Sequence, residues 1–149
     1  MTFKEKIYLR FQQVLSNKVS LLQENLDSLF RSAQNETKST AGDKHETALA
    51  MLQIEQENMR HQLSEAKNQQ SVLQKINPSI TQHRIAPGAL VKTSQGLFFI
   101  SLALGKIREE NTDVISLSPQ SPLGMRLMGL SIGEEVILNG RKYLVEEIS

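Results

Sequence analysis

Cysteine and tryptophan are both absent from this sequence of 149 residues, and aromatic residues make up only 5% of it. Without cysteine the chain can form neither a disulfide nor a thiolate metal site, and every mechanism that needs a cysteine nucleophile is excluded. The scarcity of aromatic side chains argues against a large aromatic-rich core. The composition permits a reducing compartment.

The chain also lacks an excess of either charge, since 17 Lys and Arg residues are balanced by 16 Asp and Glu residues, for a formal net charge of +1. Binding to DNA or to a membrane through bulk charge normally needs a clear excess of basic residues. No apolar run approaches the roughly 18 residues of a membrane span, and no signal-peptide run follows the N-terminus. We therefore expect a cytoplasmic protein with no membrane partner.

Proline and glycine are almost missing from the first half of the chain. Residues 1–77 contain no proline and a single glycine, Gly42, whereas residues 86–149 hold the other seven glycines and three of the four prolines. So sharp a change of composition is typical of a domain boundary. Pro78 cannot continue a helix, which predicts a linker over residues 78–85.

Apolar residues in the first half recur at alternating spacings of four and three, which is the seam of a coiled coil. The first set is Leu15, Val19, Leu22, Leu26, Leu29 and Ala33, with Tyr8 and Phe11 upstream. The second is Leu52, Met59, Ala66 and Leu73, supported by Ala48, Leu63 and Ile76. Between them lies a polar tip at about residues 34–46. The pattern predicts an antiparallel hairpin of two helices, each about 45 Å long.

Short β-branched runs in the second half predict strands at residues 89–93, 97–102, 114–117, 135–138 and 142–146. Asn139-Gly140 is a strong hairpin signal between the last two of these runs. Ser121 and Pro122 favour the start of a short helix that ends near residue 128. The expected fold class is therefore α+β, with a helical hairpin followed by a small antiparallel sheet that packs against one helix.

The run from Val114 to Val136 resembles the C-terminal domain of the bacterial Gre transcript-cleavage factors. In that family the pattern S-P-(L/I)-(G/A)-x-x-L-(L/I)-G-x-x-x-G-(D/E)-x-V joins a strand, a helix and a closing hairpin. The resemblance implies an N-terminal coiled-coil hairpin and a C-terminal domain similar to FKBP-type prolyl isomerases. Its motif is specific over this run, and only the architecture matches over residues 1–80.

The same family carries an Asp and a Glu three residues apart at the hairpin end, in a run like G-D-x-x-E-N-A. The corresponding run here is Gly42-Asp43-Lys44-His45-Glu46-Thr47-Ala48, which matches the carboxylates to Asp43 and Glu46. Thr47 replaces the Asn of the family, and Leu49-Ala50 stands where acidic and aromatic residues usually follow. An Asp-x-x-Glu pair also resembles a capping box, and one pair can serve both roles.

The resemblance implies a factor that binds RNA polymerase and inserts its hairpin into the secondary channel. Asp43 would be a metal-directing ligand, and Glu46 a second ligand or water-positioning group, for a Mg²⁺ ion that the isolated protein does not bind alone. Backtracked RNA would then be cut near its 3′ end by the polymerase itself. The chain is thus expected to be a monomeric accessory factor and not an enzyme.

Two other functions remain open. The altered tip residues favour a secondary-channel regulator without cleavage stimulation, and the FKBP-like domain suggests a prolyl isomerase. The isomerase needs aromatic pocket walls, and residues 86–149 offer only Phe98, Phe99 and Tyr143.

Several further residues are expected to be structural or solvated. The histidines His45, His61 and His83 lack the paired spacing of metal ligands, and the lysines beside the tip are Lys38 and Lys44. Phe98 and Phe99 should direct one ring to each face of a core strand. Met125, Leu127 and Met128 are expected to pack the short helix on the sheet. Glu109-Glu110 and Glu134-Glu135 are expected to be solvated turns.

Overall fold

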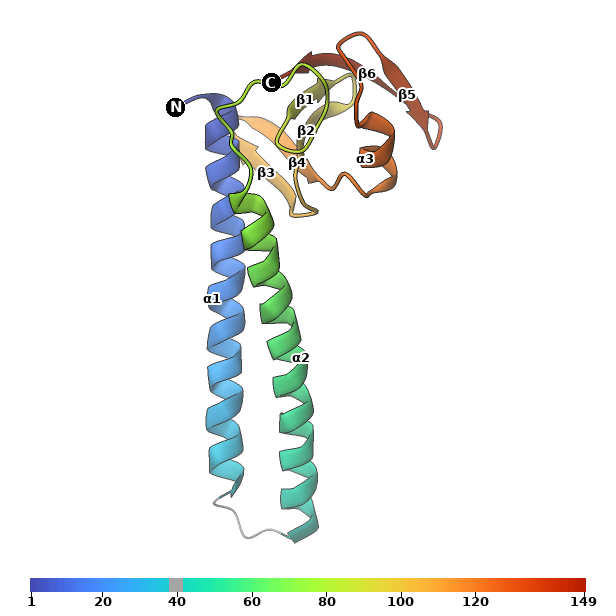
Figure 1. Ribbon diagram of the computed structural model, residues 1–149. Coiled ribbons are helices and arrows are strands. Elements are labelled where there is room, and N and C mark those ends of the chain that lie inside the picture. The colour runs from blue at the N-terminus through green and yellow to red at the C-terminus, as the bar shows by residue number, and fades with distance from the viewer. Residues whose placement is uncertain (38–41) are drawn as a thin grey trace. The chain divides into compact units, whose positions relative to one another are not determined.

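The computed structural model describes the backbone of residues 1–37 and 42–149, and the side chains of residues 1–35 and 46–149. Two long helices, α1 (Phe3–Thr37) and α2 (Gly42–Gln74), precede the strands (Figure 1). The later elements are β1 (Leu90–Thr93), β2 (Gly96–Ile100), β3 (Gly105–Glu109), β4 (Thr112–Leu117), α3 (Pro122–Leu127), β5 (Glu135–Leu138) and β6 (Arg141–Ile148). The predicted α+β class is confirmed.

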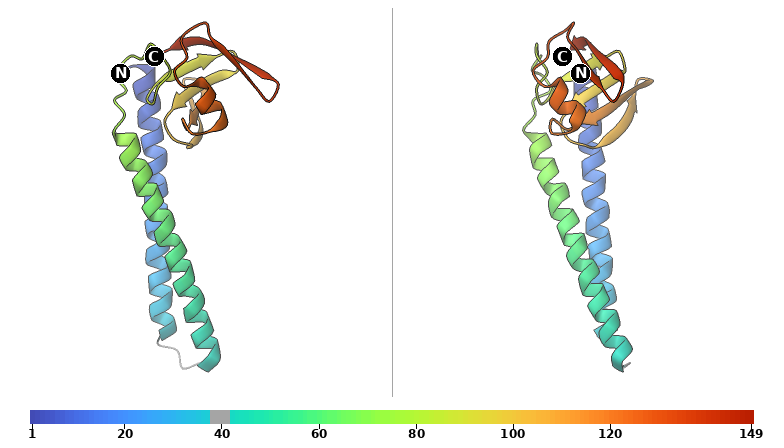
Figure 2. Two further views of the ribbon diagram at one scale, coloured as in Figure 1. Left: turned by 45° about the vertical axis from the view of Figure 1, so that its right-hand side comes forward. Right: turned by 90° about the vertical axis from the view of Figure 1, so that its right-hand side faces the viewer.

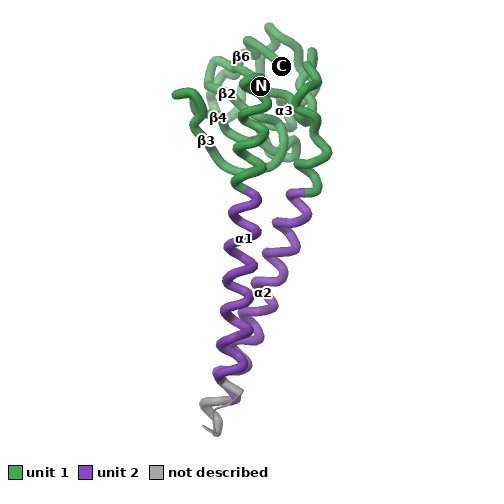
Figure 3. Tube along the Cα trace, turned by 90° about the vertical axis from the view of Figure 1, so that its left-hand side faces the viewer, with its two compact units in different colours: residues 1–14, 71–149 green, residues 15–70 purple. Residues whose placement is uncertain are grey.

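The chain divides into two compact units, coloured separately in Figure 3. Unit 1 combines Met1–Val14 with Ser71–Ser149, and unit 2 is Leu15–Gln70. The start of α1 therefore belongs to the same unit as the strands. The predicted division into a hairpin domain over residues 1–77 and a C-terminal domain over residues 86–149 stays a prediction. The segment predicted as a linker ends at Ile85, whose side chain is buried in unit 1.

Unit 2 is an antiparallel pair of helices, formed by parts of α1 and α2 that run side by side in every view (Figure 2). Its core is a single seam of buried and partly buried side chains from the predicted positions. These are Leu22, Leu26, Leu63 and Ala66, with Val19 and Met59 packed against them. The predicted coiled-coil hairpin is thus confirmed in unit 2. In the described part of the chain, no helix has an apolar stretch sufficient to cross a membrane.

One seam position of unit 2 holds a polar residue. Gln56 is only 7% exposed, and its Nε2 donates a long hydrogen bond of 3.4 Å to the carbonyl oxygen of Leu29. A buried polar side chain at such a position lowers the stability of a coiled coil while it restricts the pairing of the helices. Gln56 therefore favours one register of α1 against α2 at some cost in stability.

The Gln56→Leu substitution is expected to stabilise unit 2 by about 1 kcal/mol, because an apolar side chain avoids the desolvation of a poorly bonded amide. Urea unfolding followed by helical circular dichroism measures this change. Gln53→Leu on the exposed side of α2 is the matched control and should change little. A loss of stability in Gln56→Leu would show that the hydrogen bond to Leu29 outweighs desolvation.

Unit 1 contains a six-stranded sheet in the order β3-β4-β2-β1-β6-β5. The prediction of an antiparallel sheet is wrong, because β2 and β4 are parallel, with Leu97 opposite Val114. The chain reverses after β2, forms β3 at the edge, and reverses again into β4, which fills the space between the two. Two reversals bring β4 back to the direction of β2. Similarity to FKBP-type domains stays a prediction.

Two of the three hairpins with two-residue turns have both turn residues at positive φ. At the β5–β6 turn, Asn139 and Gly140 have φ angles of 53° and 78°, as the Asn-Gly pair predicts. At the β3–β4 turn, Glu110 and Asn111 have φ angles of 51° and 60°. Positive φ is unfavourable for glutamate, so Glu110-Asn111 is not a typical hairpin signal and this turn was not predicted.

The short helix α3 begins as predicted. The Ser121 side chain accepts a hydrogen bond of 3.0 Å from the backbone N–H of Gly124, and Pro122 occupies the first helical turn. Leu127 is fully buried in the core between α3 and the sheet. Met128 is partly buried against this core, whereas Met125 is 62% exposed. The core also contains Ile85, Ala89, Val91, Phe98, Ile100, Val136, Tyr143 and Val145.

Gly124→Ala is expected to destabilise unit 1 by roughly 1–3 kcal/mol, the usual cost of overpacking. A Cβ atom at this position would lie 1.9 Å from the backbone oxygen of Ser118, so the backbone of α3 or of its preceding turn must shift. Thermal unfolding measures the effect. Gly129→Ala separates crowding from conformation, since Gly129 has a φ of 82° but no atom near its added Cβ. Unchanged stability of Gly124→Ala would contradict the close contact.

The opposite face of the sheet packs against the beginning of α1. The Phe99 ring is fully buried and stacks on Phe11, with centroids 6.0 Å apart, and it meets the edge of Tyr8 at 6.4 Å. Phe98 instead lies 6.2 Å from Tyr143 in the core beside α3. The prediction that the two rings face opposite sides is confirmed. Tyr8 and Phe11 are more than a continuation of the helical seam, because they bind α1 to the sheet.

Candidate functional site

The hairpin end is the site that the sequence singles out. Helix α1 ends at Thr37 and α2 begins at Gly42, so Asp43 and Glu46 occupy the opening turns of α2. The side chain of Glu46 is exposed. The side chain of Asp43 lies outside the described residues. The predicted convergence of the two carboxylates on one metal ion therefore stays a prediction.

Other residues named at the tip also fall outside the described part of the chain. These are Lys38, which precedes α2, and the side chains of Lys44 and His45. Thr47, where the Gre family has Asn, is exposed and has a polar or electrostatic interaction of its own. Of the two predicted metal ligands, Glu46 is the one whose side chain lies among the described residues.

The metal-binding capacity of the tip follows from its donor atoms. Mg²⁺ prefers six oxygen ligands, and proteins commonly supply one or two carboxylates while phosphates and water complete the shell. Asp43 and Glu46 provide ligands of this chemistry. Among the side chains of residues 1–35 and 46–149, no three His, Asp or Glu residues gather as a metal-binding group. The described side chains thus add no second candidate to the pair Asp43 and Glu46.

The two described histidines lie on the surface. His61 Nε2 is 3.3 Å from Glu65 Oε1, one helical turn further along α2, and both side chains are largely exposed. His83 is exposed after the end of α2.

In unit 2, the Arg60 guanidinium lies 5.0 Å from the centroid of the Phe30 ring, an arrangement that shields part of an exposed aromatic face.

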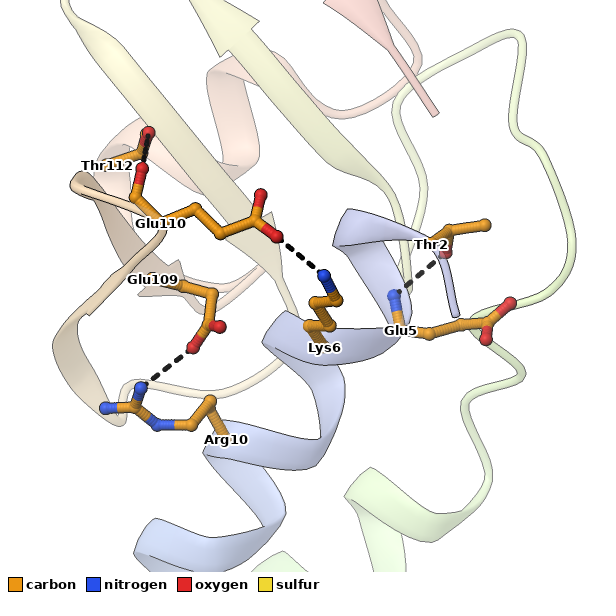
Figure 4. A network of polar contacts seen from close by, with 7 residues as sticks. All are labelled: Thr2, Glu5, Lys6, Arg10, Glu109, Glu110 and Thr112. Carbon is orange, nitrogen blue, oxygen red and sulfur yellow. Dashed lines mark hydrogen bonds and ion pairs between the residues drawn. The ribbon is translucent and has the colours of Figure 1, made fainter.

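A second polar cluster joins the start of α1 to the β3–β4 hairpin (Figure 4). Lys6 Nζ lies 2.6 Å from Glu110 Oε1, and an Arg10 guanidinium nitrogen lies 2.8 Å from Glu109 Oε2. The same Arg10 nitrogen donates to the carbonyl oxygen of Arg108 at 3.2 Å. Glu110 is a half-exposed turn residue, in keeping with the expected solvated turn, but both carboxylates also form ion pairs with α1, which the sequence analysis did not predict.

The ion pairs of this cluster change the pKa of Lys6 but contribute little to the free energy of unfolding. The hydrogen bond to the Glu110 carboxylate, followed by its negative charge, raises the pKa of Lys6. Exposed ion pairs contribute little to stability because water screens them. Their partners are 104 and 99 residues apart, so no spacing in the sequence indicates these contacts. Their role is to orient the β3–β4 hairpin against α1 beside the Phe11–Phe99 stack.

The described site can be compared with known proteins. No protein-family model matches the chain, and no curated protein matches it. Among solved structures, the chain is similar to one titled "Structure of the transcription factor Gfh1", with 15% sequence identity, 92% of each chain covered and a TM-score of 0.37. A likeness of this degree assigns neither a family nor a function, which must be argued from the residues of this chain.

Proposed function

We propose that this chain is a transcription elongation factor of the Gre type, which binds RNA polymerase and stimulates cleavage of backtracked RNA. The observation that carries the proposal is the pair Asp43 and Glu46, three residues apart at the start of the second helix of a long hairpin. The Gre-like run from Val114 to Val136 supports the same conclusion independently of the hairpin.

The dimensions of the helices suit insertion into a channel. Helix α1 has 35 residues and α2 has 33, so each is about 50 Å long at 1.5 Å per residue. The core of unit 2 is a single seam of side chains, which leaves no interior for a substrate. The functional surface of the hairpin is therefore its end or its flanks, and the carboxylates belong to the end.

The proposed action of the tip is to complete a metal site in the partner. Residues three apart on a helix share a face, so Asp43 and Glu46 can direct oxygens toward one ion. Asp43 is the metal-directing ligand, and Glu46 is a second ligand or positions the attacking water. A Mg²⁺ ion held by these carboxylates together with the polymerase would supply acidification of that water and stabilisation of the leaving oxygen. The bond cleaved is in the RNA near its 3′ end, within the polymerase, so the chain itself is an accessory factor.

The alternative is a factor that occupies the secondary channel without stimulating cleavage. Thr47 in place of Asn, and Leu49-Ala50 in place of acidic and aromatic residues, favour this alternative. It retains RNA polymerase as the partner and differs only in the chemistry of the tip. The proposed roles of Asp43 and Glu46 are absent from it.

The test combines capture of polymerase with a cleavage assay. The tagged full-length chain is expected to retain bacterial RNA polymerase, and adding the chain to backtracked elongation complexes with Mg²⁺ should shorten the RNA and release short 3′ fragments. Retention without RNA shortening would support the non-cleaving regulator. Failure to retain polymerase would overturn both functions together.

A further inference from the structure

A cavity of about 570 Å³ lies within unit 1. Its walls come from residues 2–5 at the start of α1, from residues 78–81 after α2, and from four strands of the sheet. The strand residues are Leu90 and Lys92 of β1, Leu97 of β2, Thr112 of β4 and Glu147 of β6. A volume of this size is typical of small-molecule sites.

One side chain in this cavity is unusual for its position. Lys4 is only 5% exposed, and its Nζ donates a hydrogen bond of 2.7 Å to the carbonyl oxygen of Ile80. Within the described part of the chain, this neutral oxygen is its polar partner, and no carboxylate is at ion-pair distance. Burial lowers the pKa of Lys4, as expected for a desolvated cation. A lysine ammonium has three N–H donors, so it can bind a further acceptor.

Lys4 occupies a position of α1 where an apolar residue is expected. Lys4, Tyr8 and Phe11 are spaced four and three apart, so Lys4 continues the seam that is otherwise apolar. An apolar side chain would fill this position without the penalty of burying a charge. Lys4 therefore buries a charge beside the cavity with the neutral Ile80 oxygen as its polar partner.

The lining combines apolar surface with charged residues of both signs and the first turn of a helix. Residues 2–5 form the N-terminus of α1, where Thr2 Oγ1 accepts from the Glu5 N–H at 3.1 Å, and a helix N-terminus favours negative charge. Lys92 is a second cation in the lining. Glu5 is partly exposed, and Lys92 and Glu147, which lie opposite each other in the β1–β6 pairing, are both exposed, so water screens these three charges more than that of Lys4.

We propose that this cavity binds a small organic anion, whose carboxylate or phosphate group lies against Lys4 and whose apolar body packs against Phe3 and Leu97. The bound anion supplies the charge that Lys4 lacks, and it connects the first turn of α1 to residues 78–81. This site is separate from the tip carboxylates and does not depend on the function proposed for them.

The experiment is a titration of the full-length, isotope-labelled chain followed by amide NMR. The probes are phenylphosphonate and benzoate, with benzamide as the neutral control and benzylamine as the cationic one. Both anions, or one of them, should shift the amide signals of residues 2–5 and 78–81, and the two arms separate phosphate from carboxylate recognition. Absence of these shifts with both anions, or equal shifts with benzylamine, would overturn the proposal.

Substitutions at Lys4 test the role of the ammonium. Lys4→Met should weaken binding of the anion about tenfold or more, as expected for loss of a charge-assisted hydrogen bond, and Lys4→Arg should restore most of it. Lys18→Met on the exposed surface of the same helix is the matched control. Undiminished binding by folded Lys4→Met contradicts the proposal. If that variant does not fold, the comparison of anions with benzylamine on the unaltered chain still decides it.

Discussion

Replacing Asp43 with alanine is expected to abolish the RNA cleavage that this chain stimulates in backtracked polymerase, while its binding to polymerase is unchanged. The substitution removes one of two carboxylate ligands from a shared metal ion, an interaction that contributes several kcal/mol to the transition state. We therefore expect a loss of about a hundredfold or more in the cleavage rate. The rate of RNA shortening and the retention of polymerase are measured on the same preparation.

A second substitution separates metal binding from helix capping. Asp43→Asn preserves a side-chain oxygen that can cap α2, whereas it removes the negative charge that a Mg²⁺ ligand needs. Loss of cleavage in Asp43→Asn would support the metal role, and full activity would assign Asp43 to capping. Glu57→Ala, an exposed carboxylate further along α2, is the control for general loss of negative charge. Unchanged cleavage in Asp43→Ala would refute the proposed mechanism.

The largest loss of stability is expected from Phe99→Ala, at about 3–5 kcal/mol, because the ring is fully buried and its removal leaves a cavity. Phe99 stacks on Phe11 and meets Tyr8, so its loss also removes the aromatic contact between the sheet and α1. Urea unfolding measures the free energy, and hydrogen exchange of the amides of residues 3–14 reports the attachment of the helix.

Phe98→Ala is the matched variant, because it removes the same side chain from the neighbouring position on the other face. Phe98 packs near Tyr143 in the core beside α3. Both substitutions should lower stability, but only Phe99→Ala should accelerate exchange in residues 3–14 more than in the strands. Equal acceleration in the two variants would contradict a specific role of Phe99 in holding α1.

The helical hairpin was predictable because the controlling interactions are local in sequence. The spacing of Leu22 and Leu26, and of Leu63 and Ala66, places each pair on one face of its helix, and the structure buries all four. The Asn139-Gly140 turn and the Ser121 cap were predictable for the same reason, since each is fixed by residues within a few positions.

The sheet was only partly predictable because its order depends on distant contacts. Strand β3 contains one buried apolar side chain, Ile107, among charged residues, which is too weak a pattern to indicate a strand. The parallel pairing of β2 with β4 follows from the presence of β3 and could not be inferred without it. The ion pairs of Lys6 and Arg10 leave no local pattern at all.

The candidate sites differ in the same way. Asp43 and Glu46 are three residues apart, so their relation is visible in the sequence, and the resemblance to Gre factors gives it a function. Lys4 reads as an ordinary charged residue near the N-terminus. Lys4 contacts Ile80, which is 76 residues away in the sequence. The other walls of its cavity include residues from strands that are equally distant. Only the folded structure shows that this lysine is buried.

The division of unit 1 between Met1–Val14 and Ser71–Ser149 has a consequence for the order of events during synthesis. The contacts of unit 2 can form as soon as both of its helices have left the ribosome. Residues 3–14 are synthesised before Phe99 and must wait for it, and β6, which pairs with β1 and β5, is synthesised after Phe99. Contacts between such distant segments close late. Tyr8 and Phe11 therefore remain without their permanent partner until Phe99 has been synthesised, and in that interval a chaperone would find them exposed.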